Sequence, residues 1–581
     1  MLPDVISVTY PGVALVAQVS NLLCRGFPIR KRHHVGTASD WKSGIQQVGN
    51  PRYVTVFAPA YTNRRMRERT SRFQPPTSRE SSRSKHQSRS QGARPFRAWS
   101  LELLWMLVVG CWCFSTLAAD QPQWGQAWSR NMVSSERDLP DSFDPKTGRN
   151  IKWSAELGTE THSTPVIAGG RVYIGTNNGH PRDPREVGDR GVLMCFEEKT
   201  GKFLWQLVVP KRDEDIYFDW PKSGIASPVT VEGERVYLVS NRGEVLCLEA
   251  RDGHVLWRFE LTSGAGIWSH DAAHSSILIH GDHLYLNSGT GVDNTHKRIR
   301  TPDAPSLVVL DKRTGKILAR DDEHIAPNIF HCTWSAPSLG KVNGRTLLFF
   351  AAGNGIIYAF EPLSMPPSLF TNPSIHQSNN PQIHPATLQK VWQFDFDPGA
   401  PKTNVHKYNS NRREGPSNFY GMPVLYEGRI YAAGGGDIWW GKNEAWLKCI
   451  NPAGTGDITT NGLVWSYPLE KHVMGTPAIA NDLVFIADCG RAFHCVDART
   501  GQACWTHEIN GEAWASPLAA DGKVYLGTRS GNFYIFAATR EKKLLNLIEL
   551  GDPISSTAVA ANGVLYVATM SRLYAVKKES R

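Results

Sequence analysis

The chain has 581 residues, enough for several domains, and carries a formal net charge of +10. The positive charge is concentrated at one end, because residues 1–100 contain 17 Lys and Arg against 4 Asp and Glu. Residues 101–581 are therefore close to neutral. A surface that binds nucleic acid carries its basic groups on the folded body, so this distribution excludes nucleic acid as the expected partner.

Residues 1–100 form a basic, Arg/Ser-rich leader with too few apolar side chains to offset the entropy of ordering, and we expect it to be disordered. An apolar run follows from Leu103 to Leu117, short for a bilayer span of about 20 residues. Small residues Ala118 and Ala119 end this run and polar sequence follows. The stretch 98–119 thus has the layout of a secretory signal peptide that is cleaved near its end.

Two alternatives to cleavage stay open. A lipobox ending at Cys111 would make the chain a lipoprotein, and an uncleaved segment 101–119 would serve as an anchor. The long leader also fits a translation start downstream of Met1, for example at Met66. Under each of these interpretations of the leader we expect export to the periplasm or cell envelope, with membrane contact only through the leader or anchor.

A repeat dominates the chain after a linker over 120–150. One unit reads HSTPVIAGGRVYIGTNNG followed by GVLMCFEEKTGKFLWQL, and the next reads IASPVTVEGERVYLVSNRGEVLCLEARDGHVLWRFE. Eight such starts occur, and each unit alternates apolar and polar residues between Gly, Asn and Asp turns. This pattern predicts four short antiparallel strands per unit. Sheets of this kind bury their faces by stacking around an axis, as in a β-propeller.

The ends of the repeat region predict how the ring closes. The eighth unit stops at LYAVKKES and lacks its apolar-Trp strand, whereas an orphan strand of that type, IKWSAEL around Trp153, precedes the first unit. We therefore predict an all-β, eight-bladed propeller over 151–578. Its N-terminal strand completes the last blade.

Several reactive-looking residues belong to the repeat. Six tryptophans share one position and should pack between blades, with Ala319 replacing them in the third unit and only leucines available in the seventh: Trp153, Trp205, Trp257, Trp392, Trp465 and Trp505. Seven scattered cysteines follow the leader, an odd number without the spacing of a disulfide framework. Four of them share a register with Ala359 and Ala575 and should fill the core: Cys195, Cys247, Cys449 and Cys495.

The motif V-Y-x-G/S…G…L-x-A/C-L/V-D/E…TG…W resembles the pyrroloquinoline-quinone (PQQ)-like repeat β-propeller family over about 150–578. The resemblance implies either a quinoprotein dehydrogenase, which oxidises alcohols or sugars with PQQ and Ca²⁺, or a non-catalytic propeller similar to the outer-membrane assembly lipoprotein. The chain lacks the adjacent Cys-Cys pair and the CxxCH haem motif that the dehydrogenase branch would lead one to expect. PQQ and Ca²⁺ are thus implied by the family alone.

The innermost strand of each blade should open at one pole of the channel. Counting back from the Pro-equivalent position predicts a ring of ligand-binding side chains at this pole, of which Ile225 and Ser555 are also members: His162, His274, Trp334, Tyr420, Met474 and Trp514. A flat ligand can stack on such aromatic rings while imidazoles supply hydrogen bonds. Bulky side chains that merely fill a tapering channel would give the same pattern.

Three further groups are candidates for chemistry. His270, Asp271 and His274 offer a general base or a metal pair, although neighbours on a strand point to opposite faces. The acidic loop with Asp213, Glu214, Asp215 and Asp219 offers oxygen ligands for Ca²⁺, or is simply solvated. Arg412 and Arg413 are candidates for holding a carboxylate.

The sequence therefore favours an exported, monomeric, non-catalytic scaffold that binds an envelope protein partner or a small molecule. Two alternatives remain at this point, a PQQ-dependent dehydrogenase of alcohols or sugars and a carbohydrate- or small-molecule-binding propeller. The repeat marks the fold far more strongly than it marks an activity.

Overall fold

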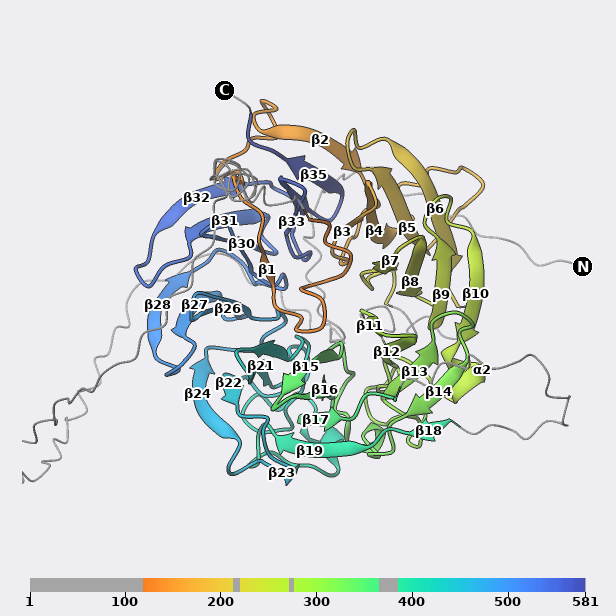
Figure 1. Cartoon of the computed structure of the whole chain (residues 1–581), viewed down its shortest axis with the longest axis vertical. Helices are drawn as coiled ribbons and strands as arrows, with labels where there is room; N and C mark the ends of the chain where they lie inside the picture. Colours follow the sequence, from red (N-terminus) through yellow and green to blue (C-terminus); the bar gives the residue numbers. More distant parts are fainter. Residues whose placement is uncertain (1–118, 213–219, 271–275, 365–384, 580–581) are drawn as a thin grey trace, which may run out of the picture. The chain divides into compact units, whose positions relative to one another are not determined.

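Eight four-stranded antiparallel sheets surround a common axis in the computed structural model, which describes residues 119–212, 220–270, 276–364 and 385–579 (Figure 1). All of these residues belong to one unit, Ser115–Arg581. The prediction of an all-β, eight-bladed propeller is confirmed. Within the described ranges the helices are short: α2 (Leu261–Ala265), η2 (Ala326–Asn328) and η3 (Val405–Tyr408).

Each blade runs from an inner strand near the axis to an outer strand at the rim (Figure 1). The first four blades are β3 (Val166–Ala168), β4 (Arg171–Asn177), β5 (Arg190–Glu197) and β6 (Phe203–Pro210); β7 (Thr230–Glu232), β8 (Arg235–Val239), β9 (Glu244–Glu249) and β10 (Val255–Glu260); β11 (Leu278–His280), β12 (His283–Asn287), β13 (Leu307–Asp311) and β14 (Ile317–Arg320); and β15 (Ser338–Val342), β16 (Arg345–Ala351), β17 (Ile356–Phe360) and β19 (Lys390–Asp395).

The fifth to seventh blades follow the same order along the chain. They are β20 (Val424–Tyr426), β21 (Arg429–Gly435), β22 (Ala445–Ile450) and β24 (Leu463–Leu469); β25 (Ala478–Ala480), β26 (Leu483–Ala487), β27 (Ala492–Asp497) and β28 (Ala503–Glu508); and β29 (Leu518–Ala520), β30 (Lys523–Gly527), β31 (Asn532–Ala537) and β32 (Leu544–Glu549). Two-residue strands add to three blades in parallel: β1 (Val133–Ser134) to β29, β18 (Ala386–Thr387) to β14, and β23 (Gly456–Asp457) to β19.

The eighth blade joins the two ends of the ring. It consists of β33 (Val559–Ala561), β34 (Val564–Ala568), β35 (Arg572–Val576) and, as its outer strand, β2 (Ile151–Glu156). Strand β2 pairs antiparallel with β35, so that Trp153 lies opposite Ala575. The predicted closure by the N-terminal strand is confirmed.

The residues of the TG…W motif form contacts between neighbouring blades. The indole N–H of Trp153 donates to the carbonyl of Glu198 in the next blade at 2.8 Å, and Trp205 donates in the same way to Ala250 at 3.1 Å. Gly201 of the TG turn has φ +72°, and a Cβ at this position would lie 2.6 Å from the ring of Trp153. Glycine is therefore required both by the left-handed backbone and by the close packing of the tryptophan.

The shared register of the repeat is confirmed, with one correction. Cys195, Cys247, Cys449 and Cys495 each pair with the repeat tryptophan of their blade. Burial raises the pKa of Cys195 to about 12, as expected for a thiol that fills the core, and all seven cysteines of the described residues are free thiols. The correction concerns the seventh blade, where Asn546 rather than a leucine occupies the tryptophan position, opposite Ile535.

The stretch 120–150, which the sequence presents as a linker, contacts the inner strands around the ring. We call residues 119–134 the strap. Its carbonyl groups accept backbone N–H bonds from five inner-strand residues: Ile167, Val231, Leu339, Leu425 and Ala519. The strap runs over the centre of the ring in Figure 1 (orange) and supplies partners for strand edges that no neighbouring strand covers.

Arg130 and Asn131 fasten the strap with side-chain bonds. The Arg130 guanidinium is fully buried and donates to the carbonyls of Pro337, Trp124 and Ser276, each at 3.1 Å. Asn131 exchanges two hydrogen bonds of 2.8 Å with the backbone of Ile479. Burial lowers the pKa of Arg130 to about 9, because the charged guanidinium is disfavoured away from water.

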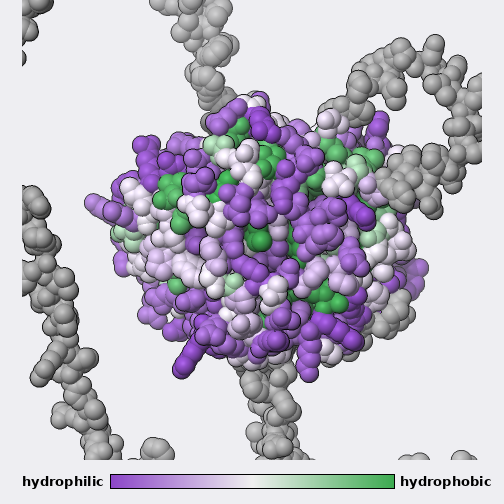
Figure 2. All heavy atoms as spheres, turned by 90° about the horizontal axis from the view of Figure 1, so that it is seen from below, coloured by the Kyte–Doolittle hydropathy of each residue, from purple (hydrophilic) through white to green (hydrophobic). Residues whose placement is uncertain are grey.

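The outer surface is mainly polar. The side of the ring in Figure 2 is largely hydrophilic, with hydrophobic side chains in small separate spots. The exposed leucines of the outer strands, such as Leu204, Leu256 and Leu544, lie in different blades. None of the described helices is long and apolar enough to cross a membrane.

Candidate functional site

A pocket lies in the central channel, at the pole where the inner strands begin. It encloses about 530 Å³ of empty space, part of it open to solvent. Its lining gathers five of the side chains that the sequence places at this pole, together with Ser555: His162, Trp334, Tyr420, Met474 and Trp514. Trp124 of the strap, with Thr164, Ala226 and Pro228, completes the lining.

The repeat positions these side chains. Seven of the lining residues lie four residues before the first residue of an inner strand, for example His162 before β3 and Trp514 before β29. Because all blades enter the channel in the same register, equivalent positions meet at one pole. Ile225, which the sequence places in this ring, is instead fully buried in the core between the first two blades, and its neighbour Ala226 lies four residues before β7 and lines the pocket.

Aromatic and charged groups gather around Trp514 in the pocket lining. The rings of His162 and Trp514 are stacked, with centroids 6.1 Å apart. The Arg529 guanidinium lies 4.6 Å from the centre of the Trp514 ring and donates a 2.7 Å hydrogen bond to the Ser555 hydroxyl. The indole N–H of Trp514 donates to Glu512 at 3.2 Å. This side of the pocket therefore presents a flat aromatic face held by ionic neighbours.

A buried hydrogen-bonded group lies behind Tyr420, which forms another part of the pocket wall. The Tyr420 hydroxyl donates to Asp437 Oδ2, and His331 Nδ1 donates to the same oxygen at 2.9 Å. The other oxygen, Oδ1, accepts the backbone N–H groups of Trp439 and Trp440 at 2.9 and 2.7 Å. Burial alone would raise the pKa of Asp437, but the imidazole and these hydrogen bonds hold it well below its usual range. Asp437 is thus a carboxylate at neutral pH.

The loop between β21 and β22 brings Asp437 and its neighbouring tryptophans to this wall. A Cβ at Gly436 would lie 1.8 Å from the carbonyl oxygen of Lys442, so the turn accepts only glycine there. Trp439 packs against Trp334 and Trp514, with centroids 5.3 and 6.0 Å away. The loop therefore links the pocket to the residues behind it.

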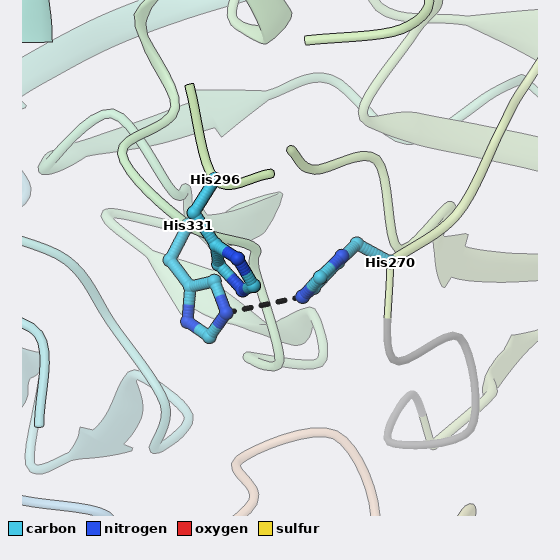
Figure 3. Close-up of side chains that lie close together, drawn as sticks. All are labelled: His270, His296 and His331. Atoms are coloured by element: carbon cyan, nitrogen blue, oxygen red, sulfur yellow. Dashed lines mark hydrogen bonds between the residues drawn. The ribbon is translucent and has the colours of Figure 1, made fainter. Parts of the chain in front are cut away.

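Three imidazoles converge directly behind this wall. His270, His296 and His331 are all buried, and their candidate ligand atoms lie within 4.8 Å of one another. Figure 3 shows the rings pointing toward a common centre, with a bond of 3.1 Å between Nε2 of His270 and Nε2 of His331. The ring of Trp440 lies 4.9 Å from that of His296.

The remaining predicted site residues fall into two groups. Asp271, His274, Asp213, Asp215 and Asp219 lie outside the described residues, so their roles stay predictions. Arg412 donates to the carbonyls of Ile438, Trp439 and Gly441, which fixes the loop that carries Asp437. The Arg413 side chain is exposed, and a carboxylate ligand for the pair stays a prediction.

Sequence reasoning named His270 but missed His296, His331 and Asp437. Each of the missed residues lies in a polar, aromatic-rich insertion that interrupts the repeat, namely 294–305, 331–335 and 437–446. Those insertions could have indicated the site, because functional residues are concentrated in loops on a rigid scaffold. Their convergence could not be read from spacing, since they come from different blades.

Comparisons with known proteins show which family this chain resembles. The model of the PQQ-type repeat family described as "Outer membrane protein assembly factor BamB" matches residues 189–364 and 443–580, more than half of the chain. Quinohemoprotein alcohol dehydrogenase ADH IIB of Pseudomonas putida is 22% identical over 423 residues, which cover 67% of this chain but only 57% of the dehydrogenase. This chain therefore spans little more than half of that relative's length.

Two further comparisons represent both functional branches. Outer membrane protein assembly factor BamB of Yersinia pestis is 20% identical over 408 residues, which cover 66% of this chain and 88% of BamB. A europium-containing methanol dehydrogenase superposes with a TM-score of 0.51 at 11% identity, covering 79% of this chain and 98% of that one, and shows the shared fold alone. The match of the family model over both halves of the ring shows that this chain belongs to the PQQ-repeat propeller family, the family of the outer membrane protein assembly factor BamB.

Proposed function

We propose that this chain is an exported propeller that does not catalyse a reaction but binds a protein partner in the cell envelope through its pole pocket. The main support for this proposal is the composition of the pocket, which is lined by Trp334, Tyr420, Met474 and Trp514 among others. Aromatic and Met side chains are enriched at the centres of protein interfaces, where they hold a protruding residue of the partner. Similarity to an assembly factor supports a protein as the partner.

The export part of the proposal rests on the sequence before the ring. The apolar run that ends at Ala118 and Ala119 has the composition of a signal peptide. An envelope location also agrees with the printed name of the BamB relative, an outer membrane protein assembly factor.

The described lining of this pocket does not offer the ligands that a calcium-bound quinone of the dehydrogenase branch would need. Ca²⁺ takes oxygen ligands that include carboxylates, whereas the described residues that line the pocket include no Asp or Glu. The nearby Asp437 uses both oxygens for bonds to His331, Tyr420 and the backbone of the loop. The described lining of the pocket therefore supplies no carboxylate to the metal that this chemistry would need.

A carbohydrate is the second candidate, on one specific observation. The partly exposed Trp514 presents an indole with Arg529, Glu512 and His162 beside it. A sugar ring can stack on such an indole while polar neighbours bind its hydroxyl groups. This ligand would occupy the same pocket as the proposed protein partner.

Site-specific photocrosslinking in cells that express the full chain tests the proposal. We expect p-benzoylphenylalanine at His162, at the pocket, to form a discrete protein adduct of higher mass on irradiation. The matched control places the probe at Leu256, an exposed residue of the outer strand β10 that is 38% accessible, and should give no such adduct. A protein adduct that is absent at position 162, or identical at both positions, would contradict partner binding at the pole.

A further inference from the structure

The three imidazoles behind the pocket wall have the composition of a metal site. We propose that His270, His296 and His331 bind a first-row transition-metal ion of the Zn²⁺ class. This site is separate from the pole pocket, and it does not depend on the partner that the pocket takes. The proposal stands on the convergence of three buried nitrogen donors from three different segments of the chain.

The spacing of the donors suits one ion. Zn–N bonds of about 2.0–2.1 Å place two nitrogens on a tetrahedral ion roughly 3.3 Å apart. The Nε2 atoms of His270 and His331 are 3.1 Å apart, and the full set lies within 4.8 Å. Small rotations of the His296 ring therefore complete the site. In the chain without metal, the two Nε2 atoms form a hydrogen bond in which one carries the proton and the other accepts it, and this accounts for the short distance.

Asp437 prepares His331 to act as a ligand. Its carboxylate accepts the Nδ1–H of His331 at 2.9 Å, with both side chains at most 1% exposed. This bond fixes the tautomer of His331, so that Nε2 carries the lone pair and points at the other two rings. Metal-bound histidines commonly donate their second N–H to a carboxylate in this way.

Backbone contacts hold all three histidines in place. His270 donates its N–H to Gly289 at 2.8 Å, and the carbonyl of His331 accepts the N–H of Val292 at 2.9 Å. His296 has φ +56°, a left-handed conformation that is uncommon for a residue with a side chain. Its carbonyl accepts a bond from Asn409, which belongs to a distant insertion. An uncommon backbone conformation that the surrounding contacts hold in place is typical of functional sites.

The donors select the class of metal. Imidazole nitrogen suits Zn²⁺, Cu²⁺, Ni²⁺ and Fe²⁺, whereas Ca²⁺ and Mg²⁺ require oxygen. Within the described ranges the cluster consists of these three imidazoles, so a tetrahedral ion would take its fourth ligand from outside this set. Because His331 and Trp439 are in ring contact at 5.2 Å, the ion would also stiffen the wall of the pole pocket.

Zinc titration of the chelator-treated full chain by isothermal calorimetry tests the site. We expect one ion per chain, and roughly 100-fold or greater loss of affinity in each of His270→Gln, His296→Gln and His331→Gln. Asp437→Asn, which keeps the shape of the carboxylate but weakens its bond to His331, should lose about 10–100-fold. Two controls should bind zinc like the wild type: His283→Gln, which changes a buried histidine of β12, and His254→Gln, which changes an exposed one.

X-ray absorption of the zinc-loaded wild type supplies a test that needs no variant. The expected spectrum shows nitrogen at about 2.0–2.1 Å with the outer scattering of imidazole rings. A shell of sulfur at about 2.3 Å would place the ion on cysteines and overturn the proposal. Absence of stoichiometric binding to the wild type, or unchanged binding in the triple histidine variant, would overturn it as well. Crosslinking at the pole is independent of all these outcomes.

Discussion

Replacing Arg130 by alanine should lower the free energy of unfolding by about 3–5 kcal/mol, because each buried acceptor left without a donor costs about 1–3 kcal/mol. The substitution removes the donor from three carbonyls, those of Trp124, Ser276 and Pro337. Loss of the burial cost of the cation offsets only part of this effect. Urea unfolding followed by circular dichroism measures the change.

Arg137 provides the matched control, since it lies shortly after the strap on the same segment and its side chain is exposed. Arg137→Ala should change stability by less than about 0.5 kcal/mol. Equal effects of the two substitutions would mean that the strap is not fastened to the inner strands by Arg130.

Replacing Trp153 by alanine should cost about 3–5 kcal/mol, the range typical of a large aromatic removed from a core. Trp153 is 7% exposed, its ring packs on Gly201, and its indole N–H bonds Glu198 of the neighbouring blade. It lies on β2, the strand that closes the ring, so the lost contacts join the two ends of the chain. Denaturant unfolding of both proteins at the same pH measures the difference.

Ser154 on the same strand serves as the control, because its side chain points outward and is exposed. Ser154→Ala keeps the backbone pairing with Tyr574 and should stay within about 0.5 kcal/mol of the wild type. A loss under about 1 kcal/mol for Trp153→Ala would show that the closing strand contributes little to the fold.

The fold was largely predictable because it repeats. Eight similar units reveal strand order and turn positions, and the orphan strand around Trp153 predicts the closure found with β35. The strap was not predictable, since 120–150 has no periodic pattern and contacts the blades through carbonyls and a few polar side chains. Asn546 escaped notice because a register shift lies beside it, so counting along the strand does not locate its partner.

The candidate site was predictable only where it follows the repeat. Counting from the inner strands brought His162, Trp334, Tyr420, Met474 and Trp514 to one pole, where the structure places them together. The histidine cluster depends instead on the tertiary packing of insertions that have no repeat register. Spacing along the chain carries no information about such a meeting.

Incubation of the purified chain with PQQ and Ca²⁺ tests the central claim, that this propeller binds rather than oxidises. We predict no saturable quinone binding at up to roughly tens of micromolar and no dye reduction with alcohols or sugars, because the described lining of the pocket offers no carboxylate for calcium. Saturable binding accompanied by substrate-dependent dye reduction would contradict this account and make the chain a dehydrogenase.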